Sequence, residues 1–574
     1  MRAALVPALL LTVLAQALSI LTQVSPLGTG RLVDGDCYMR LARVEALMHG
    51  NGWYDATTTL LNAPWGEALH WTRPFDLLIA LAAFSLTVAY EIKDAVWLAG
   101  LWISPLLEFL AVAALIWGLK PHLKTGGLIL AAALFVFQPS IMGVFLPARP
   151  DHHSLQILLE ICVLAGLMRP GLKSTVLAGL AAALALWVSA EALLLILASG
   201  LALGLAWMIE GAKVRRRLIA FTLALALGAT LALVIERPPS DWLLQEFDRL
   251  SLVQVSLCWF LTLSTAWLAF GNDWACTWQR RLLLGTGMAA QAAGLMALAF
   301  PHFFAGPYGN LDPRLVPIWF SLVKEAQPIS FGAKSLILLA PPILALLYAS
   351  WRLIRTSDVR QPLLAAFCAL LVYTLASLHQ VRIAAFAQAA DIAPWTLLVL
   401  AALGLGRMKV VAVPLVLVGH LLAAVVIVRM GLGVRDPGAP DICSWDRLAA
   451  HLQAQNLQDR RPILTYIFPG PELAYLSGHP VVAGPYHRST EGILDIVGSL
   501  SAKDDAFARD LVLKRKIGLI ALCDGESEAF GFTEKGGEQG FHAKLLRGDA
   551  PGWLKAQPVP NVPKGRFVLY EVIP

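Results

Sequence analysis

Long runs of apolar residues separated by short polar loops dominate the first 430 residues of the chain. A membrane-spanning helix needs about 20 mainly apolar residues. Stretches of this kind begin near residues 4, 95, 126, 154, 174, 192, 218, 253, 282, 334, 362, 385 and 409. One further stretch, PFDLLIALAAFSLTVAY at 74–90, is short and contains Asp76, so it could span the bilayer or lie on its surface as an amphipathic helix. The pattern predicts an α-helical polytopic membrane protein.

The charges of the loops decide how the ambiguous stretch 74–90 is counted. If it is not a span and the N-terminus is cytoplasmic, the inside loops are KPHLK, MRPGLK, GAKVRRR, TWQRR, WRLIRTSDVR and GRMK. Every one of these loops is basic, as cytoplasmic loops usually are. Counting 74–90 as a span would place all of them outside. We therefore predict about thirteen transmembrane helices, with the C-terminus on the exoplasmic side.

The last part of the chain lacks long apolar runs. It alternates strand-like pieces (RPILTYIF, HPVVAGPY, KIGLIALC, GRFVLYEVI) with helical pieces (SWDRLAAHLQAQN, DDAFARDLVLKRK). This alternation is typical of a small α/β domain. The expected organisation is a transmembrane domain over residues 1–430, with large external loops at 28–94 and 301–333, followed by a soluble exoplasmic α/β domain over residues 431–574.

Composition agrees with a membrane protein. Hydrophobic residues make up 57% of the chain and charged residues 15%, and the mean hydropathy is +0.65, whereas soluble proteins have roughly 25% charged residues. The net charge of +6 is spread over short loops and fits positive-inside bias better than nucleic-acid binding. The first 25 residues resemble a signal peptide, but their long apolar run favours a retained first span.

The cysteines show no CxxC pair, which argues against a zinc or thioredoxin-like site. Cys443 and Cys523 both lie in the C-terminal region. If that region is exported they could form a disulfide, and two free thiols are the alternative.

Three short acidic motifs fall on the predicted exoplasmic side: VDGDCYMR, RPDHHS and SLVKEAQP. Carboxylate oxygens and an imidazole nitrogen can together ligate a divalent cation, and this donor set suits Mn²⁺ or Mg²⁺. Such an ion would neutralise a leaving phosphate or pyrophosphate and act as a Lewis acid. The candidate metal ligands are Asp36, Asp151, His153 and Glu325.

Each motif also has a purely structural explanation. Asp34 and Asp36 are compatible with solvated loop residues, and Asp151 is suited to cap the helix that follows it. A lone carboxylate such as Glu325 is seldom catalytic. The placement of all three motifs on one side of the membrane is what favours a common site.

The order and spacing of these motifs resemble the catalytic subunit of oligosaccharyltransferases, including the single-subunit bacterial and archaeal enzymes. These are polytopic GT-C glycosyltransferases with a C-terminal exoplasmic domain. GDCYMR is similar to the first acidic motif of that family, in which an Asp is followed two residues later by Tyr, here Asp36 and Tyr38. PDHHSLQ is similar to the archaeal form of the second motif, with Asp151 and His153 in the ligand positions.

Three further stretches carry the resemblance. SLVKEAQP is similar to an external-loop motif in which a Glu precedes Gln-Pro, here Glu325, Gln327 and Pro328. GEALHWTRPFDLLIAL resembles the stretch ahead of the second span, which is an external-loop helix in that family and agrees with the loop charges. HQVRIAAF resembles the place where an Arg, here Arg382, holds the phosphate of the lipid-linked donor.

Two features depart from the family. Its C-terminal domain normally carries a WWDYG motif that reads the hydroxyl of an Asn-X-Ser/Thr acceptor, and the matching place here reads LTYIFPGPELAYLSGHP. The acceptor is therefore not necessarily such a sequon. The run GPYHRS, with Tyr486, His487 and Arg488, could contact another acceptor or a sugar, or could be a strand followed by a polar turn. Arg149 lies closer to Asp151 than the corresponding Arg of the family.

The resemblance implies a metal-dependent, inverting transfer of a sugar or oligosaccharide from a polyprenyl phosphate or pyrophosphate. Asp36 and Glu325 would also orient or deprotonate the acceptor. Arg382 would bind phosphate oxygens, with Arg149 adding positive charge nearby. His152 would point away from the metal or support its ligands. The remaining candidate contacts to acceptor or sugar are Asp34, Tyr38 and Gln327.

Two alternatives stay open at this point. One is a GT-C transferase that modifies a lipid or polysaccharide, and the other is a non-enzymatic transporter or flippase of lipid-linked sugars. Transporters place ionisable residues inside their spans, whereas the notable acids here lie in outside loops. Isolated exceptions such as Glu191 lie near a span boundary. The expected location is a bacterial inner membrane, with the site and the C-terminal domain on the periplasmic face.

Overall fold

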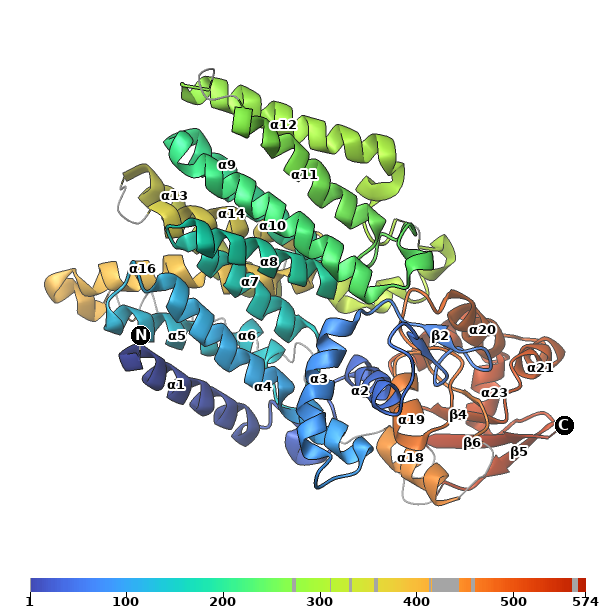
Figure 1. Cartoon of the computed structure of the whole chain (residues 1–574). Coiled ribbons are helices and arrows are strands. Elements are labelled where there is room, and N and C mark those ends of the chain that lie inside the picture. The colour runs from blue at the N-terminus through green and yellow to red at the C-terminus, as the bar shows by residue number, and fades with distance from the viewer. Residues whose placement is uncertain are drawn as a thin grey trace.

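A helical bundle and a smaller C-terminal α/β region make up the molecule. The computed structural model describes residues 2–270, 275–309, 311–329, 333–355, 360–411, 414, 443–455, 460–559 and 566–573. Long helices run side by side in the bundle, and the C-terminal region packs against one of its ends (Figure 1). The predicted domain boundary near residue 430 lies outside the described residues.

The helices of the bundle follow the predicted apolar runs. They are α1 (Arg2–Leu21), α4 (Ile92–Leu119), α5 (Thr125–Val136), α6 (Pro139–Val144), α7 (His153–Met168), α8 (Leu172–Val188), α9 (Ala192–Glu210), α10 (Ala212–Glu236), α11 (Leu252–Phe270), α12 (Trp278–Ala299), α13 (Ala333–Arg355), α14 (Arg360–Ser377), α15 (Ala384–Ala390) and α16 (Ile392–Leu403). The run predicted from residue 409 lies almost entirely outside the described residues.

The number of spans differs from the prediction. Among the described residues, 7 helices are long and apolar enough to cross a membrane, and the bent pair Val381–Ala390 and Ile392–Leu403 raises the number to 8. Four more helices, α5, α7, α8 and α14, are apolar but shorter. Local breaks explain two of these: Pro139 opens a new helix after α5, and the Arg169-Pro170 step ends α7. The protein is an integral multi-pass membrane protein, and the predicted count of thirteen spans is not confirmed.

The ambiguous stretch 74–90 forms α3 (Arg73–Leu86), which has 14 residues and is not among the candidate spans. It lies beside α2 (Gly35–Met48), the helix that follows the first span (Figure 1). Pro74 stands in its first turn, where a missing backbone N–H costs nothing. The length of α3 agrees with leaving this stretch out of the spans.

Asp76 is fully buried and joins α2 to α3. Its Oδ1 accepts from Arg40 Nη1 at 2.9 Å, and its Oδ2 accepts from Arg43 Nη2 at 2.8 Å and from Arg73 Nη1 at 3.3 Å. Burial raises the pKa of Asp76, but the charges of Arg43, Arg40 and Arg73 lower it further, so the net shift is below its usual value. The acid that made this stretch look unlike a span is thus the anion of a buried three-arginine cluster.

The C-terminal region contains a 4-stranded sheet in the order β3-β4-β6-β5. β3 (Ile463–Leu464) and β4 (Leu519–Cys523) are parallel, and β6 (Phe567–Val572) is antiparallel to β4 and to β5 (Leu554–Gln557). The helices around the sheet are α18 (Trp445–Ala454), α19 (Gly470–Ser477), α20 (Thr490–Leu500), α21 (Asp505–Lys514), α22 (Ala529–Gly536) and α23 (Phe541–Arg547). A small α/β region at the C-terminus, as the alternating pattern predicts, is confirmed.

One predicted strand is wrong. HPVVAGPY makes only an isolated bridge, between Val481 and Ile463. Around this bridge, Ile463 N–H donates to Pro480 O and Val482 N–H donates to Ile463 O. The other side of the stretch bonds to the first external segment: Val481 N–H donates to Leu60 O, and Ala63 N–H donates to Val481 O. This segment, which includes the hairpin β1 (Thr57–Thr58) and β2 (Glu67–Ala68), therefore lies against the C-terminal region. A local pattern of apolar residues does not show which partner supplies the hydrogen bonds.

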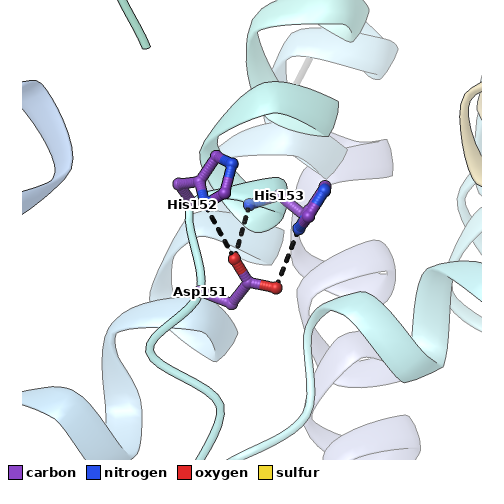
Figure 2. A group of neighbouring side chains, drawn as sticks. All are labelled: Asp151, His152 and His153. Carbon is purple, nitrogen blue, oxygen red and sulfur yellow. Dashed lines mark hydrogen bonds and ion pairs between the residues drawn. The ribbon is translucent and has the colours of Figure 1, made fainter. Parts of the chain in front are cut away.

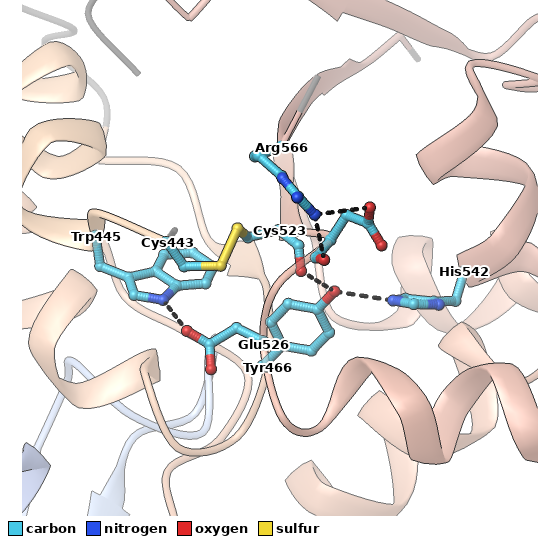
Figure 3. Close-up of a disulfide and its surroundings, with 8 residues drawn as sticks. Cys443, Trp445, Tyr466, Cys523, Glu526, His542 and Arg566 are labelled. Carbon is cyan, nitrogen blue, oxygen red and sulfur yellow. Dashed lines mark hydrogen bonds and ion pairs between the residues drawn. A yellow bond between two sulfur atoms is a disulfide. The ribbon is translucent and has the colours of Figure 1, made fainter. Parts of the chain in front are cut away.

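A disulfide joins Cys443, just before α18, to Cys523 at the end of β4 (Figure 3). It closes a loop of 80 residues. Beside it, Trp445 Nε1 donates to Glu526 Oε1 at 2.6 Å, and the Tyr466 hydroxyl donates to Cys523 O at 3.0 Å. The alternative of two free thiols does not apply in this structure.

Cys523→Ser is expected to lower the unfolding free energy of the C-terminal region by about 2–5 kcal/mol, because the unfolded chain then regains the freedom of a long loop. Thermal unfolding of the purified protein measures this, and a reductant should shift the wild type toward the variant. Cys276→Ser, which changes an exposed free cysteine, is the matched control and should unfold like the wild type. A wild type that unfolds identically with and without reductant would contradict the prediction.

Candidate functional site

The three acidic motifs act on one another electrostatically in the folded chain. Asp34 caps α2 by accepting from Cys37 N–H at 3.1 Å, which places Asp36 in the first helical turn. Burial and the charges of Asp34, Asp151 and Glu325 raise the pKa of Asp36 to about 8. Carboxylates that share a site disfavour one another's ionisation. Residues from three distant loops therefore contribute to one acidic cluster.

Asp151 holds two imidazoles at once (Figure 2). Its Oδ1 lies 2.9 Å from His152 Nδ1, and its Oδ2 lies 2.8 Å from His153 Nδ1. Arg149 Nη2 adds an ion pair to Oδ2 at 3.3 Å, and Asp151 is only 5% exposed. One ligand atom from each of Asp151, His152 and His153 lies within 4.8 Å of the others. His152 thus contacts the candidate ligand Asp151, and its predicted placement relative to a metal stays a prediction.

Glu191, at the N-terminus of α9, connects this group to Arg382. Glu191 Oε1 lies 2.9 Å from Arg382 Nε, and Glu191 Oε2 lies 3.8 Å from His153 Nε2. Arg382 Nη1 in turn lies 3.7 Å from Glu325 Oε1. The site is thus an alternating row of charges from Asp151 through His153, Glu191 and Arg382 to Glu325.

Sequence reasoning noted Glu191 but assigned it no role, because it belongs to no motif. The one available signal was a lone carboxylate between two apolar runs, a position that is expensive without a function or a partner. His70, from the stretch GEALHW, was also missed. Its ring centroid lies 4.6 Å from that of His487. Sequence spacing does not show either pairing.

Two predicted contact residues have other partners. Gln327 Nε2 donates to Phe320 O at 2.5 Å, which folds the loop that carries Glu325, and its backbone O accepts from Val381 N–H beside Arg382. The Tyr38 hydroxyl accepts from Leu32 N–H at 3.1 Å, and its ring lies against Trp97 and Tyr475. Residues two apart on a helix point in different directions, so Asp36 and Tyr38 do not share a face of α2. The side chains of Gln327 and Tyr38 thus both form hydrogen bonds with backbone groups nearby in the sequence.

The run GPYHRS reaches the site from the C-terminal region. Tyr486 is buried, interacts with Asp36 and packs edge-on against Trp71, with ring centroids 5.3 Å apart. His487 Nε2 lies 2.7 Å from Asp248 Oδ2, and Arg488 pairs with both oxygens of Asp248 at 2.9 Å. Arg488 Nη2 also donates to Glu246 Oε1 at 2.9 Å. Tyr486 therefore faces the acids, whereas Arg488 binds the neighbouring loop over residues 237–251.

Acidification is expected to weaken the ionic contact between Arg488 and Glu246. Burial raises the pKa of Glu246, but the hydrogen bond and charge of Arg249, with the charges of Arg488 and Arg237, bring it down to about 2 from a usual 4.5. A carboxylate with a depressed pKa stabilises the fold fully above its unfolded pKa, and this is lost as the pH falls toward the folded pKa. The thermal midpoint should therefore drop between about pH 5 and pH 2 more steeply in the wild type than in Glu246→Gln. Equal slopes would contradict the assignment.

The donor atoms fit a divalent cation. His153 Nε2 and Glu191 Oε2 are buried, and neither has a hydrogen-bond partner among the residues described. An imidazole nitrogen with nearby carboxylate oxygens is a suitable donor set. Of the four predicted ligands, Asp151 and His153 belong to the close group, while Asp36 and Glu325 do not. The Glu325 side chain is 52% exposed and pairs with Arg382.

Comparisons with known proteins find solved structures with a similar fold. No protein-family model and no curated protein sequence match the chain. The structure is similar to the archaeal oligosaccharyltransferase AglB from Archaeoglobus fulgidus in complex with an inhibitory peptide and a dolichol-phosphate, with 12% identity and a TM-score of 0.71 over 96% of this chain and 72% of that one.

Two other structures of the Archaeoglobus fulgidus oligosaccharyltransferase are similar. The complex with Zn and sulfate has 14% identity and a TM-score of 0.69 over 100% of this chain and 74% of that one. The enzyme tethered to an acceptor peptide with an NVT sequon has 14% identity and a TM-score of 0.66 over 99% and 74%. The resemblance read from the acidic motifs is confirmed in the fold, which is similar to that of the Archaeoglobus fulgidus oligosaccharyltransferase.

Proposed function

We propose that the protein is a membrane glycosyltransferase that transfers a sugar or oligosaccharide from a polyprenyl phosphate or pyrophosphate to an acceptor. The mutual electrostatic influence of Asp36, Asp151 and Glu325, which come from three separate loops, carries this proposal. The same fold in AglB accommodates a dolichol-phosphate in one structure and an acceptor peptide in another. A substrate whose tail stays in the bilayer requires a protein that meets it at the membrane surface.

The residues divide the work between the donor and the acceptor. Arg382 would bind phosphate oxygens, since its guanidinium is 17% exposed and held by Glu191 and Glu325. Asp36 would accept a hydrogen bond or a proton from the acceptor, because its carboxylate stands at the start of α2 among the other acids of the site. Asp151, His153 and Glu191 would hold a divalent cation, with Asp36 and Glu325 as the other predicted ligands. The cation, when bound, supplies Lewis acidity.

Metal removal is expected to stop the reaction. Purified protein given a polyprenyl-linked oligosaccharide should release polyprenyl phosphate or pyrophosphate with Mn²⁺ or Mg²⁺, and EDTA should reduce this at least about 100-fold. Adding back the ion should restore the rate. Undiminished release in EDTA would contradict metal dependence, and no release under any condition would contradict the transferase itself.

The acceptor is proposed to differ from an Asn-X-Ser/Thr sequon. Tyr486 stands beside Asp36 in a segment without the WWDYG motif. A protein with another recognition sequence, a lipid and a polysaccharide are the acceptor classes to compare. Mass spectrometry of the glycans and glycolipids that change when the gene is deleted distinguishes them.

A transporter of lipid-linked sugars is the second candidate. Glu108, Glu160 and Asp391 are fully buried in the helical bundle. From the sequence, only isolated acids near span boundaries, such as Glu191, stood out. Intramembrane carboxyls are functional candidates by default. Movement of a fluorescent lipid-linked sugar across reconstituted vesicles, without release of lipid phosphate, would favour this function over transfer.

The site is proposed to face the periplasm from a bacterial inner membrane. Basic loops on the opposite side support this orientation. The Cys443–Cys523 disulfide supports it independently, because such bonds persist in oxidising compartments. Labelling of a cysteine introduced at the exposed position Lys503 by a membrane-impermeant reagent tests the orientation of the C-terminal region.

A further inference from the structure

A cavity lies at the C-terminal end of α2, the helix that carries Asp36 near its start. It encloses about 420 Å³ between the C-terminal half of α2, the loop over residues 51–60, the starts of α3 and α4, and the C-terminal region. Cavities of this size hold small organic molecules rather than single ions. None of the residues that line it belongs to the row of charges from Asp151 to Glu325.

The cavity lies within reach of the acidic site. Glu45 lines it and is on the same helix as Asp36. At a rise of about 1.5 Å per residue, the two positions are about 13 Å apart along α2. Nine residues are about two and a half helical turns, so the Asp36 and Glu45 side chains leave α2 on opposite sides, and a glycan that occupies both places must pass around the helix.

The walls carry an excess of positive charge. Four arginine or lysine side chains line the cavity, against two carboxylates, Glu45 and Asp55. Arg43 and Arg73, together with Arg40, form ion pairs with Asp76. The Glu236 carboxylate also acts electrostatically on Arg43 and Arg73. The Tyr475 hydroxyl donates to Glu45, one of these two carboxylates that line the cavity. The cavity favours an anion.

Exposed cations stand on opposite walls. Lys93 comes from the start of α4, and its Nζ lies 5.9 Å from the ring centroid of Tyr475. Arg460 comes from the C-terminal region and packs over Gly478, where a Cβ atom would lie 2.9 Å from the guanidinium. Neither Lys93 nor Arg460 has an ion pair within the described ranges of the chain. The charge of Lys93 acts on Glu45 across the cavity lining, and the Arg460 side chain is exposed to a ligand.

The remaining lining is rich in hydroxyl and amide groups, from Asn51, Thr57, Thr59, Gln453 and Ser477. Such groups match the hydroxyls of a sugar, and the aromatic ring of Tyr475 adds an apolar surface. The chemistry of the walls therefore indicates a polar, negatively charged, sugar-sized ligand.

We propose that this cavity binds an acidic saccharide unit, bearing a carboxylate or a phosphate, at about 13 Å from Asp36 along α2. The unit would belong either to the glycan on the lipid donor or to a polysaccharide acceptor. This inference rests on the proposed transferase function and narrows its substrate to glycans with an acidic sugar.

Calorimetric titration of the full-length protein in detergent tests the binding directly. Sodium digalacturonate is the acidic probe, and cellobiose is the neutral disaccharide of similar size. Digalacturonate should bind at least about tenfold more tightly than cellobiose, and Lys93→Glu and Arg460→Glu should each weaken its binding at least about tenfold. Equal binding of the two sugars, no binding of digalacturonate, or unchanged binding in both variants would overturn the proposal.

Arg509→Glu is the matched control, since Arg509 is exposed on α21 of the same region and does not line the cavity. It should bind digalacturonate like the wild type. Because the titration needs no catalysis, a wild type that releases no lipid phosphate would refute the transferase without touching this result.

Turnover with an acidic glycan then identifies the source of the unit. If the unit belongs to the donor, Lys93→Glu should slow the release of lipid phosphate even without an acceptor. If it belongs to the acceptor, Lys93→Glu should slow only the transfer. A variant that binds digalacturonate weakly but transfers acidic glycans at the wild-type rate would show that the cavity has no part in the reaction.

Discussion

Asp151→Ala is expected to reduce the release of polyprenyl phosphate at least about 1,000-fold while the protein stays folded. The carboxylate binds His152, His153 and Arg149 at once. Its loss leaves both imidazoles without the acceptor that orients them and removes one candidate metal ligand. The measurement is single-turnover release of the lipid from a polyprenyl-linked oligosaccharide, with saturating Mn²⁺.

Asp241→Ala is the control for this experiment. Asp241 is a partly exposed aspartate on a neighbouring external loop, where it accepts a hydrogen bond from Ser240. We expect wild-type release from this variant. Thermal unfolding and gel filtration of Asp151→Ala establish that it is folded. An Asp151→Ala protein with wild-type activity would end the proposed role of the acidic site.

The second large effect is on stability. Asp76→Ala is expected to lower the unfolding free energy by about 3–5 kcal/mol, because removing one partner of a buried ionic group leaves uncompensated charge. Here three guanidiniums, from Arg40, Arg43 and Arg73, would lose the carboxylate with which each forms an ion pair. Equilibrium unfolding in detergent with increasing denaturant measures the difference.

Asp510→Ala removes an exposed aspartate of the C-terminal region and should change the unfolding free energy by less than about 0.5 kcal/mol. If Asp76→Ala unfolds within about 1 kcal/mol of the wild type, the buried cluster does not hold α2 and α3 together. Activity adds a second readout, since α2 carries Asp36 and loss of its anchor should lower turnover as well as stability.

The arginine cluster also connects the two sites on α2. Arg40 Nη2 lies 3.4 Å from His152 Nδ1, and the Arg40 guanidinium stacks 4.2 Å from the centroid of the Trp71 ring. Arg43 and Arg73 line the cavity at the C-terminal half of α2. Arginine side chains therefore extend from His152 at the acidic site to the cavity.

Several conclusions could be drawn from the order of residues alone. Apolar runs predict helices because a backbone in hydrocarbon must satisfy its own hydrogen bonds locally. Loop charges placed 74–90 outside the spans, and α3 is indeed too short to be a candidate span. The three acidic motifs also pointed to an oligosaccharyltransferase-like fold, since ligand residue types and their order are visible in a sequence.

Contacts between distant segments needed the folded chain. Glu191 joins His153 to Arg382, Tyr486 comes beside Asp36, and Asp76 neutralises arginines from two helices. HPVVAGPY bridges β3 at Ile463 and also bonds to the first external segment. Periodicity along a chain reports which face of an element is apolar, but not which other element meets that face. Partners of buried charges are chosen by packing, and packing exists only in three dimensions.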